Sequence, residues 1–410
     1  MKIGYLKFTM NMELDFTAGK IGNIEGRATL FKAIVDAGWD LTLYSQISAH
    51  DEQVYFERKY SNEYGIDNRW ISKIDYRAGG KVKPNTDLLI VENGPDNWLF
   101  RTRYGINYGN QPFVRRCAEV LNTYQGLVFI LNIHPDVPFP LDKMAYCDVP
   151  YGSNRNVYRS GNGSDVKHGW ASWDEVCKDK KLVFFNQAYN QEAYLDAFDK
   201  KRQGYRKHKV KFYRLPILYG DWLIPENIRG WFRKKPHFEL VYMGYPRYRE
   251  KEFRQFFFDI SEAKIDSWGP WNKKANLKFK EEATNNGIKV HDFLPAQVQC
   301  TLKYQNSKVT LGLISKKLQA CGWVTHRTLE SIHSGCILLG LRNAEGISDY
   351  LDDDFLVGDK EEFVSKIKQV LNWSYIQRKH AHEEQFKKIK KYDGEFMLKY
   401  LTKMYRREKT

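Results

Sequence analysis

Short apolar runs alternate with helix-like amphipathic segments along most of the chain. The run at residues 1–8 and the segment at 28–39, which has apolar residues at helical spacing and closes on Gly38, form the first such pair. Continuous apolar strands separated by helices predict a parallel sheet covered on both faces. By the same reasoning we expect strands at 41–47, 86–94, 126–133, 182–189 and 210–218, helices at 112–124 and 191–201, and a long loop at 151–172.

A second series with the same alternation follows a segment at 220–237 that is typical of a linker. It contains predicted strands at 238–246, 263–270, 287–294, 309–315 and 336–340, and helices at 250–260, around 301–308, at 326–335 and at 363–373. A helical, charged tail runs from 374 to 410. Because 410 residues exceed what one hydrophobic core usually fills, we expect two α/β domains.

Composition points to a soluble protein with a polyanionic partner. The net charge is +15, and 15% of the residues are aromatic, including 26 Tyr and 11 Trp. Such a charge favours nucleic acid or an acidic membrane surface, and exposed aromatic rings suit sugars and bases. The chain shows neither a signal peptide nor a membrane span, so we expect a cytoplasmic protein. The six cysteines have no zinc-site spacing, and we expect no metal site.

The stretch HRTLESIHSGCILLG, residues 326–340, places a cation and a carboxylate in the first turn of a predicted helix. Arg327 and Glu330 are three residues apart and therefore share one helix face. The pair could be a surface ion pair worth about 0.2 to 0.5 kcal/mol. Alternatively it could recognise a nucleotide, with the arginine on a diphosphate and the carboxylate on ribose hydroxyls. Spacing alone leaves both interpretations open.

The order of motifs resembles one family of enzymes. The run TLESIHSGCILLG is similar to the nucleotide-sugar signature of GT-B glycosyltransferases. The series DLLIVEN, HPDVPF, QAYNQEAYLDAFDKK, YMGYPRYRE, IDSWGP, SKVTLGLISKK and HRTLES resembles, in that order, the DNA β-glucosyltransferases of T-even bacteriophages. The resemblance is distant but covers most of the chain. It implies two Rossmann-like doubly wound domains facing a central cleft, with C-terminal helices crossing back to the first domain.

The resemblance implies domain bounds and a donor site. It implies an N-terminal acceptor domain at 1–222, a C-terminal UDP-sugar domain at 238–375, and a helical tail at 376–410 that packs on the N-terminal domain. Arg327 and Glu330 would hold the diphosphate and the ribose of the donor. Two further diphosphate arginines match Arg247 and Arg249, with Arg254 as the alternative to the second. Backbone around Trp268 and Gly269 would form the uracil pocket.

The family places its catalytic carboxylate after the fourth strand, shortly before a Pro-Phe pair. The segment here reads NIHPDVPF: a gapless match puts His134 at the base position, whereas residue type favours Asp136. Either side chain is a competent general base. We expect Asp136 to be the base, with His134 as orienting partner or substitute, and Glu25 as a further carboxylate near the donor sugar.

The implied activity is transfer of a sugar from a UDP-sugar to hydroxymethylcytosine in duplex DNA. UDP-glucose is the expected donor, with arabinose as the alternative sugar and hydroxymethyluracil as the alternative acceptor. The anomeric centre would be inverted and the base flipped. A divalent metal could assist but is not required, and we expect a monomer that binds no membrane. Alternatives are a lipid, glycan or protein acceptor, or a non-catalytic DNA-binding protein. Clustered cations predict DNA contacts at Lys200, Lys201, Arg202, Arg206, Lys207, Lys209, Arg233 and Lys234.

Overall fold

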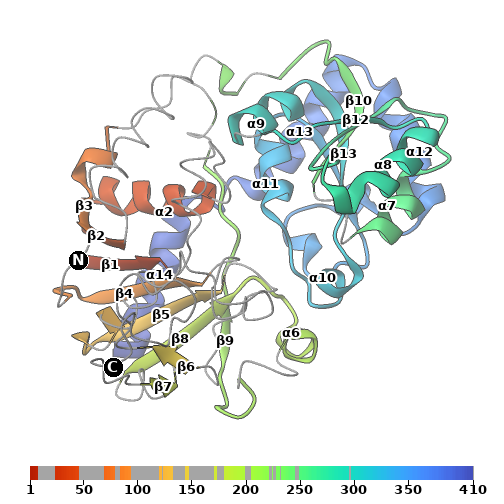
Figure 1. The fold of residues 1–410 in the computed structure, drawn as a ribbon. Helices are drawn as coiled ribbons and strands as arrows, with labels where there is room; N and C mark the ends of the chain where they lie inside the picture. Colours follow the sequence, from red (N-terminus) through yellow and green to blue (C-terminus); the bar gives the residue numbers. More distant parts are fainter. Residues whose placement is uncertain are drawn as a thin grey trace.

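The computed structural model describes the following parts of the chain: 1–7, 24–45, 69–78, 84–93, 120–121, 123–132, 144–146, 170–172, 180–198, 205–220, 224, 228–230, 232–244, 249–294 and 297–409. These residues form two α/β lobes, each built on a parallel sheet (Figure 1). The two sheets contain all the strands that the apolar runs predict.

The first lobe contains a seven-stranded sheet with the order β3-β2-β1-β4-β5-β8-β9, and every neighbouring pair is parallel. The central strand β5 reads LVFILN and is buried along its whole length, as expected for a strand covered on both faces. The strands are β1 (Lys2–Lys7), β2 (Asp40–Ser45), β3 (Asp75–Ala78), β4 (Leu88–Asn93), β5 (Leu127–Asn132), β8 (Lys181–Asn186) and β9 (Phe212–Arg214).

The second lobe contains a six-stranded parallel sheet with the order β12-β11-β10-β13-β14-β15. Its strands are β10 (Phe238–Met243), β11 (Ile265–Trp268), β12 (Lys289–His291), β13 (Ser307–Gly312), β14 (Ile337–Leu341) and β15 (Leu356–Val357). The helices between them are α7 (Glu250–Phe257), α8 (Leu277–Asn285), α9 (Gln297–Gln305), α10 (Lys316–Ala320), α11 (His326–His333) and α12 (Lys360–Asn372).

In each sheet, successive strands are added first toward one edge and then, from one point on, toward the other edge. In the first sheet the reversal lies between β1 and β4, and in the second it lies between β10 and β13. Ligands of open parallel sheets bind outside the carboxyl ends of the strands at such a switch point. In the second lobe, the topology therefore indicates a site near the segments that follow β10 and β13.

The last helix of the chain packs on the first lobe. Helix α14 (Gly394–Lys409) lies beside α2 (Ile24–Asp36), close to the first strand of the chain (Figure 1). At Gly394 a side chain would be 2.5 Å from the carbonyl of Thr29, so only glycine allows this approach. The preceding helix α13 (Tyr375–Ile389) packs instead against α11 and β14 of the second lobe. The expected tail therefore packs on both lobes, α13 on the second and α14 on the first. The chain crosses between the lobes after α13.

A second connection joins the lobes beyond the end of β8. The backbone N–H groups of Tyr189 and Asn190 both donate to the carbonyl of Cys321, at 3.0 and 3.1 Å. The Tyr189 side chain lies against Gly322 and Gly346: an added Cβ would be 2.6 Å from the Tyr189 Cβ at Gly322 and 2.5 Å from its ring at Gly346. The Arg214 guanidinium lies 4.7 Å from the centre of the same ring. Backbone bonds and close packing therefore fix the lobes at this edge.

The sequence pattern missed several elements. The end of the expected loop at 151–172 is a strand, β7 (Trp170–Ser172), which pairs antiparallel with β6 (Met144–Tyr146). A three-residue strand is too short to show an alternating pattern. Pairing with another segment of the same chain defines it instead. The edge strand β3 and helices α8 and α10 were also missed, because their polar residues mask any apolar period.

Candidate functional site

Helix α11 carries the expected donor-binding pair. The helix begins after Thr325, whose backbone is extended, and its C-terminal turn is closed by Ser334, whose Oγ donates to the carbonyl of Glu330 at 2.6 Å. Glu330 is only 5% exposed, although it is a carboxylate. Charged groups are rarely buried to this extent unless they are paired or serve a site. Arg327 is half-buried one turn earlier.

Neighbouring groups favour the charged form of Arg327. Burial opposes the charged form, but Tyr242, Tyr304 and Glu330 together raise the pKa of Arg327 above its ordinary value. The arrangement places a permanently charged guanidinium beside the buried side chain of Glu330.

A second arginine reaches the same neighbourhood from the segment after β10. Tyr242 is 2% exposed near the carboxyl end of that strand, and its hydroxyl accepts a hydrogen bond from Nη1 of Arg249 at 3.3 Å. The hydroxyl lies below Gly244, where an added Cβ would be 2.6 Å away from it. Because Tyr242 also contributes to the pKa of Arg327, it links the two arginines at the switch point of the second sheet.

Arg254 is committed to another contact. Its Nε and Nη2 donate to the two carboxylate oxygens of Glu282, at 2.6 and 2.7 Å, and the guanidinium lies over the ring of Phe279. Glu282 raises the pKa of Arg254, although burial opposes this. Of the two alternatives for the second phosphate arginine, the structure thus leaves Arg249 beside the site and ties Arg254 to α8.

The turn after β11 is tight and built from backbone. Gly269 approaches Gly244 so closely that a Cβ would meet the Gly244 carbonyl oxygen at 2.2 Å. The Trp268 ring is stacked on His291 at 4.3 Å, and the ammonium of Lys303 lies 5.4 Å from its centre. His291 and Lys303 cover the ring, and Trp268 is only 5% exposed. Trp268 therefore supports the turn and does not present its ring for stacking.

The sequence analysis did not single out two tyrosines beside the expected donor-binding pair. Tyr242 and Tyr304 are buried around Arg327 and Glu330. Burial and then the negative charge of Glu330 raise the pKa of Tyr304 well above its ordinary value. A tyrosine in an apolar strand, such as Tyr242, is usually a core residue, so only its placement beside Arg327 and Arg249 distinguishes it.

The expected catalytic residues are not among those described. His134 and Asp136 lie outside the described residues, although β5 ends at Asn132 immediately before them. Glu25 belongs to α2, but its side chain is not described, and Arg247 also falls outside the described part. The carboxyl edge of the first sheet therefore leads directly into the segment in which the base is expected.

The expected DNA contacts fall into different settings. Lys200, Lys201 and Arg202 lie outside the described residues. Arg206 pairs with Glu192 at 3.2 Å and with Asp196 at 2.8 Å, so its charge is partly compensated. Among the expected DNA contacts, the exposed lysines are Lys207, Lys209 and, in the linker, Lys234.

The linker next to Arg233 is anchored by α13. The buried Arg378 donates to the carbonyl oxygens of Arg233 and Lys234, at 2.6 and 3.1 Å. Its guanidinium also lies 5.2 Å from the centre of the Phe232 ring. These contacts hold the backbone of 232–234 against the second lobe and leave the Lys234 side chain exposed.

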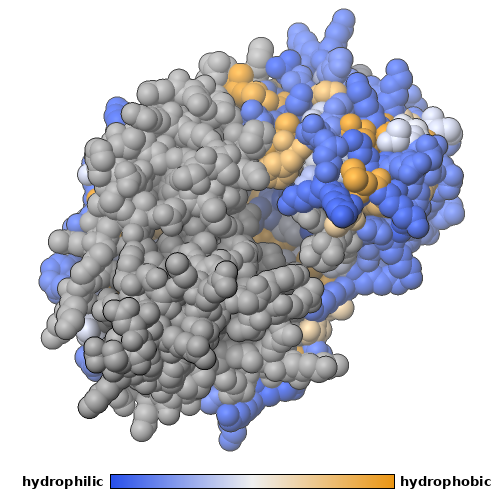
Figure 2. Space-filling view, in the orientation of Figure 1, coloured by the Kyte–Doolittle hydropathy of each residue, from blue (hydrophilic) through white to orange (hydrophobic). Residues whose placement is uncertain are grey.

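The surface is largely hydrophilic over the second lobe (Figure 2). Across the described ranges, no three His, Cys, Asp or Glu side chains are grouped so that they could hold a metal ion. Within the same ranges, the helices are all too short or too polar to cross a membrane.

The fold agrees with that of solved glycosyltransferases. T4 phage β-glucosyltransferase in complex with its UDP-glucose substrate superposes with a TM-score of 0.60 at 15% identity, covering 95% of each chain. The same phage enzyme with UDP and Mn²⁺ gives 0.58 at 15% identity over the full length of both chains. AviGT4, a glycosyltransferase of avilamycin A biosynthesis, gives 0.52 at 10% identity, covering 99% of this chain and 97% of AviGT4. No protein-family model and no curated protein matches the sequence. The comparison confirms the expected GT-B architecture. Each of the two α/β lobes is built on a parallel sheet, and the last helix of the chain returns to the first lobe.

Proposed function

We propose that this protein is a UDP-sugar-dependent glycosyltransferase that modifies DNA. The observation that carries the proposal is the cluster at the second switch point: Arg249 and Arg327 converge on Tyr242, with the buried Glu330 beside them. Two guanidinium groups match the two phosphates of a nucleoside diphosphate, and a buried carboxylate accepts hydrogen bonds from ribose hydroxyls. A lone surface ion pair would need neither burial nor a second arginine.

The reaction we propose is an inverting transfer. The acceptor hydroxyl attacks the anomeric carbon of the sugar, the bond from that carbon to the diphosphate oxygen breaks, and UDP leaves with the electron pair. The hydroxyl proton passes to a general base, for which Asp136 and His134 are the candidates. Arg249 and Arg327 would stabilise the negative charge that develops on the leaving diphosphate, and this role needs no general acid.

The acceptor we propose is the hydroxymethyl group of 5-hydroxymethylcytosine in duplex DNA. The net charge of +15 supports a polyanionic acceptor, and exposed Lys207, Lys209 and Lys234 are suited to phosphate contacts. T4 phage β-glucosyltransferase, which shares the fold, is described as a DNA modifying enzyme. A cytosine stacked in a duplex is out of reach of a site between two lobes, so the proposal includes base flipping.

The proposal is tested by incubating the protein with UDP-glucose and hydroxymethylcytosine-containing DNA, digesting the DNA, and weighing the nucleosides. We expect one hexose on each modified hydroxymethylcytosine, and less of this product from Glu330→Gln at a limiting concentration of UDP-glucose. A parallel reaction with UDP-arabinose identifies a pentose donor. If neither donor gives a sugar-bearing nucleoside although the DNA is bound, the protein is a non-catalytic DNA-binding protein. If the sugar reaches only lipid, glycan or protein, the DNA acceptor is wrong.

A further inference from the structure

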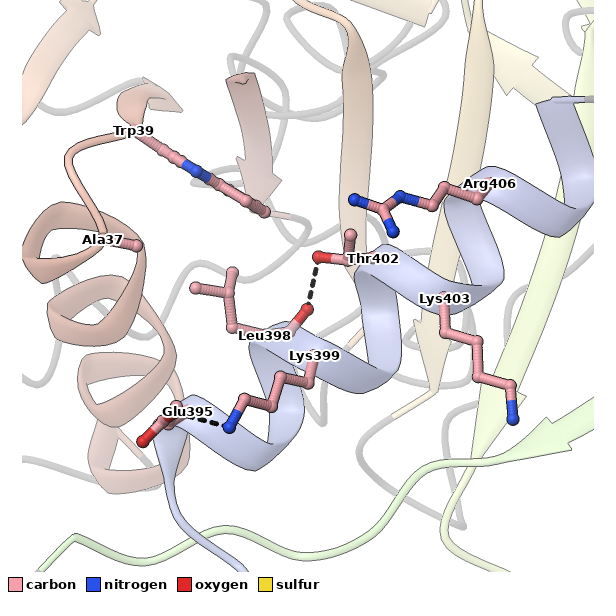
Figure 3. Close-up of a pocket in the computed structure, with 8 residues that line it drawn as sticks. All are labelled: Ala37, Trp39, Glu395, Leu398, Lys399, Thr402, Lys403 and Arg406. Carbon is pink, nitrogen blue, oxygen red and sulfur yellow. Dashed lines mark hydrogen bonds and ion pairs between the residues drawn. The ribbon is translucent and has the colours of Figure 1, made fainter.

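A pocket opens on the first lobe between α14 and the turn that follows α2 (Figure 3). Its volume is about 510 Å³, within the range of small-molecule sites. Trp39 lies just before the amino end of β2, whereas the donor cluster lies at the carboxyl ends of the other sheet. The pocket is therefore separate from the proposed transfer site. Its lining comprises Ala37, Trp39, Glu395, Leu398, Lys399, Thr402, Lys403 and Arg406.

One side of this pocket is flat and apolar. The Trp39 indole stands across from Leu398 and Thr402 of α14 (Figure 3). Trp39 is half-buried and packs against the hydrophobic core, which fixes the ring in place. The Thr402 hydroxyl donates to the carbonyl of Leu398 at 2.6 Å, so it is already used within the helix. The walls thus offer a ring and a methyl-rich surface for a planar body.

The rim of the pocket carries excess positive charge. Lys399, Lys403 and Arg406 follow one another at spacings of four and three residues and so share a face of α14. Lys399 pairs with Glu395 at 2.6 Å, which leaves no net charge on that pair. Neither Lys403 nor Arg406 is ion-paired with a carboxylate in the described part of the chain. The Arg406 guanidinium is turned toward the space beside Trp39 (Figure 3).

We propose that this pocket binds a nucleoside monophosphate. The indole of Trp39 would stack on the base, because every nucleobase has a flat aromatic face. The planar fork of Arg406 suits bidentate contact with phosphate, and Lys403, on a flexible stem, supplies the second charge. Two uncompensated cations match the charge of about −1.5 to −2 that a phosphomonoester carries at pH 7. An uncharged aromatic compound would leave both cations unused.

The test is calorimetric titration of the full-length protein with AMP, repeated with Glu330→Gln, which alters the proposed donor site and leaves this pocket unchanged. We expect a Kd below about 1 mM, weakened about tenfold in Arg406→Gln and also in Trp39→Leu. Adenosine and inorganic phosphate, each carrying half of the ligand, should bind at least about tenfold more weakly than AMP. Arg407→Gln is the matched control, because Arg407 is the next residue of α14 but lies over the ring of Tyr213, 5.3 Å away. It should bind AMP like the wild type.

Three results would overturn the proposal: no heat of AMP binding, equal affinity for AMP and adenosine, or equal weakening by Arg406→Gln and Arg407→Gln. Thermal unfolding of each variant establishes that it is folded. Arg406 is exposed and has no ion pair in the described residues, so its replacement leaves a folded protein to test even if Trp39→Leu does not fold. The proposal is independent of the transferase function, because the pocket shares no residue with the proposed donor site and the AMP affinity should be the same in Glu330→Gln as in the wild type.

Discussion

We predict that His333, the last residue of α11, makes the folded protein less stable in mild acid. The residue ends α11, and its ring lies between Tyr219 and Phe386, with ring centres 4.9 and 5.2 Å away. Neither ring nitrogen has a hydrogen-bond partner in the described structure. Burial, with a smaller contribution from His382, lowers the pKa of His333 from its ordinary value of 6.5 to about 3.

The direction and size of the effect follow from this pKa. Between pH 6.5 and about 3 the unfolded chain binds a proton at His333 and the folded chain does not, so the stability that is complete above pH 6.5 is lost as the pH falls. From pH 7 to pH 5 the loss is about 2 kcal/mol. This is a large share of the roughly 5 to 15 kcal/mol that stabilises a typical protein.

Urea unfolding of the wild type and His333→Phe at pH 7 and pH 5 measures this loss. A phenyl ring keeps the contacts with Tyr219 and Phe386 but cannot be protonated, so the variant should lose about 2 kcal/mol less than the wild type between the two pH values. His380→Gln, at an exposed position of α13, is the control and should behave like the wild type. Equal losses in wild type and His333→Phe would refute the reasoning.

Three further predictions concern the second lobe, two of them at the proposed donor site. Glu330→Gln should weaken UDP binding about tenfold in a calorimetric titration, because a charge-assisted hydrogen bond to the ribose is lost. Arg249→Gln should weaken UDP binding by a similar factor of about ten, whereas Arg254→Gln, which breaks the contact with Glu282, should leave UDP affinity unchanged. Gly269→Ala should lower the unfolding temperature, since its Cβ meets the Gly244 carbonyl at 2.2 Å, whereas Gly358→Ala, with its nearest atom at 3.4 Å, should have little effect.

Each of these expectations has a result that contradicts it. Unchanged UDP affinity in Glu330→Gln would mean that Glu330 has a structural role and does not bind the ribose. A larger effect from Arg254→Gln than from Arg249→Gln would assign the second phosphate contact to α7 and α8. Equal unfolding temperatures for Gly269→Ala and wild type would mean that the two glycine turns do not constrain each other.

The sheets could be predicted from sequence because burial on both faces leaves an unmistakable pattern. Strands such as β5 and β14 read LVFILN and ILLGL, and every residue in them is buried. Polar or very short elements could not be predicted: β3 reads DYRA at an edge of the sheet, and β6 and β7 have three residues each. Their existence depends on pairing between distant segments, which no local pattern records.

Part of the proposed donor site also has a local signal in the sequence. Arg327 and Glu330 share one helix, so their spacing alone places them together. The choice between Arg249 and Arg254 could not be made from sequence, because both follow the same glycine turn within ten residues. It depends on Tyr242 and Glu282, which come from β10 and α8 and approach the arginines only in the folded chain.

The central claim is that a nucleoside diphosphate is held at the switch point of the second sheet. A crystal structure of the protein with UDP tests this most directly. We predict that the ribose hydroxyls lie within hydrogen-bond distance of Glu330 and that the phosphates contact Arg327 and Arg249. UDP bound elsewhere, with Glu330 still buried against protein alone, would contradict the claim.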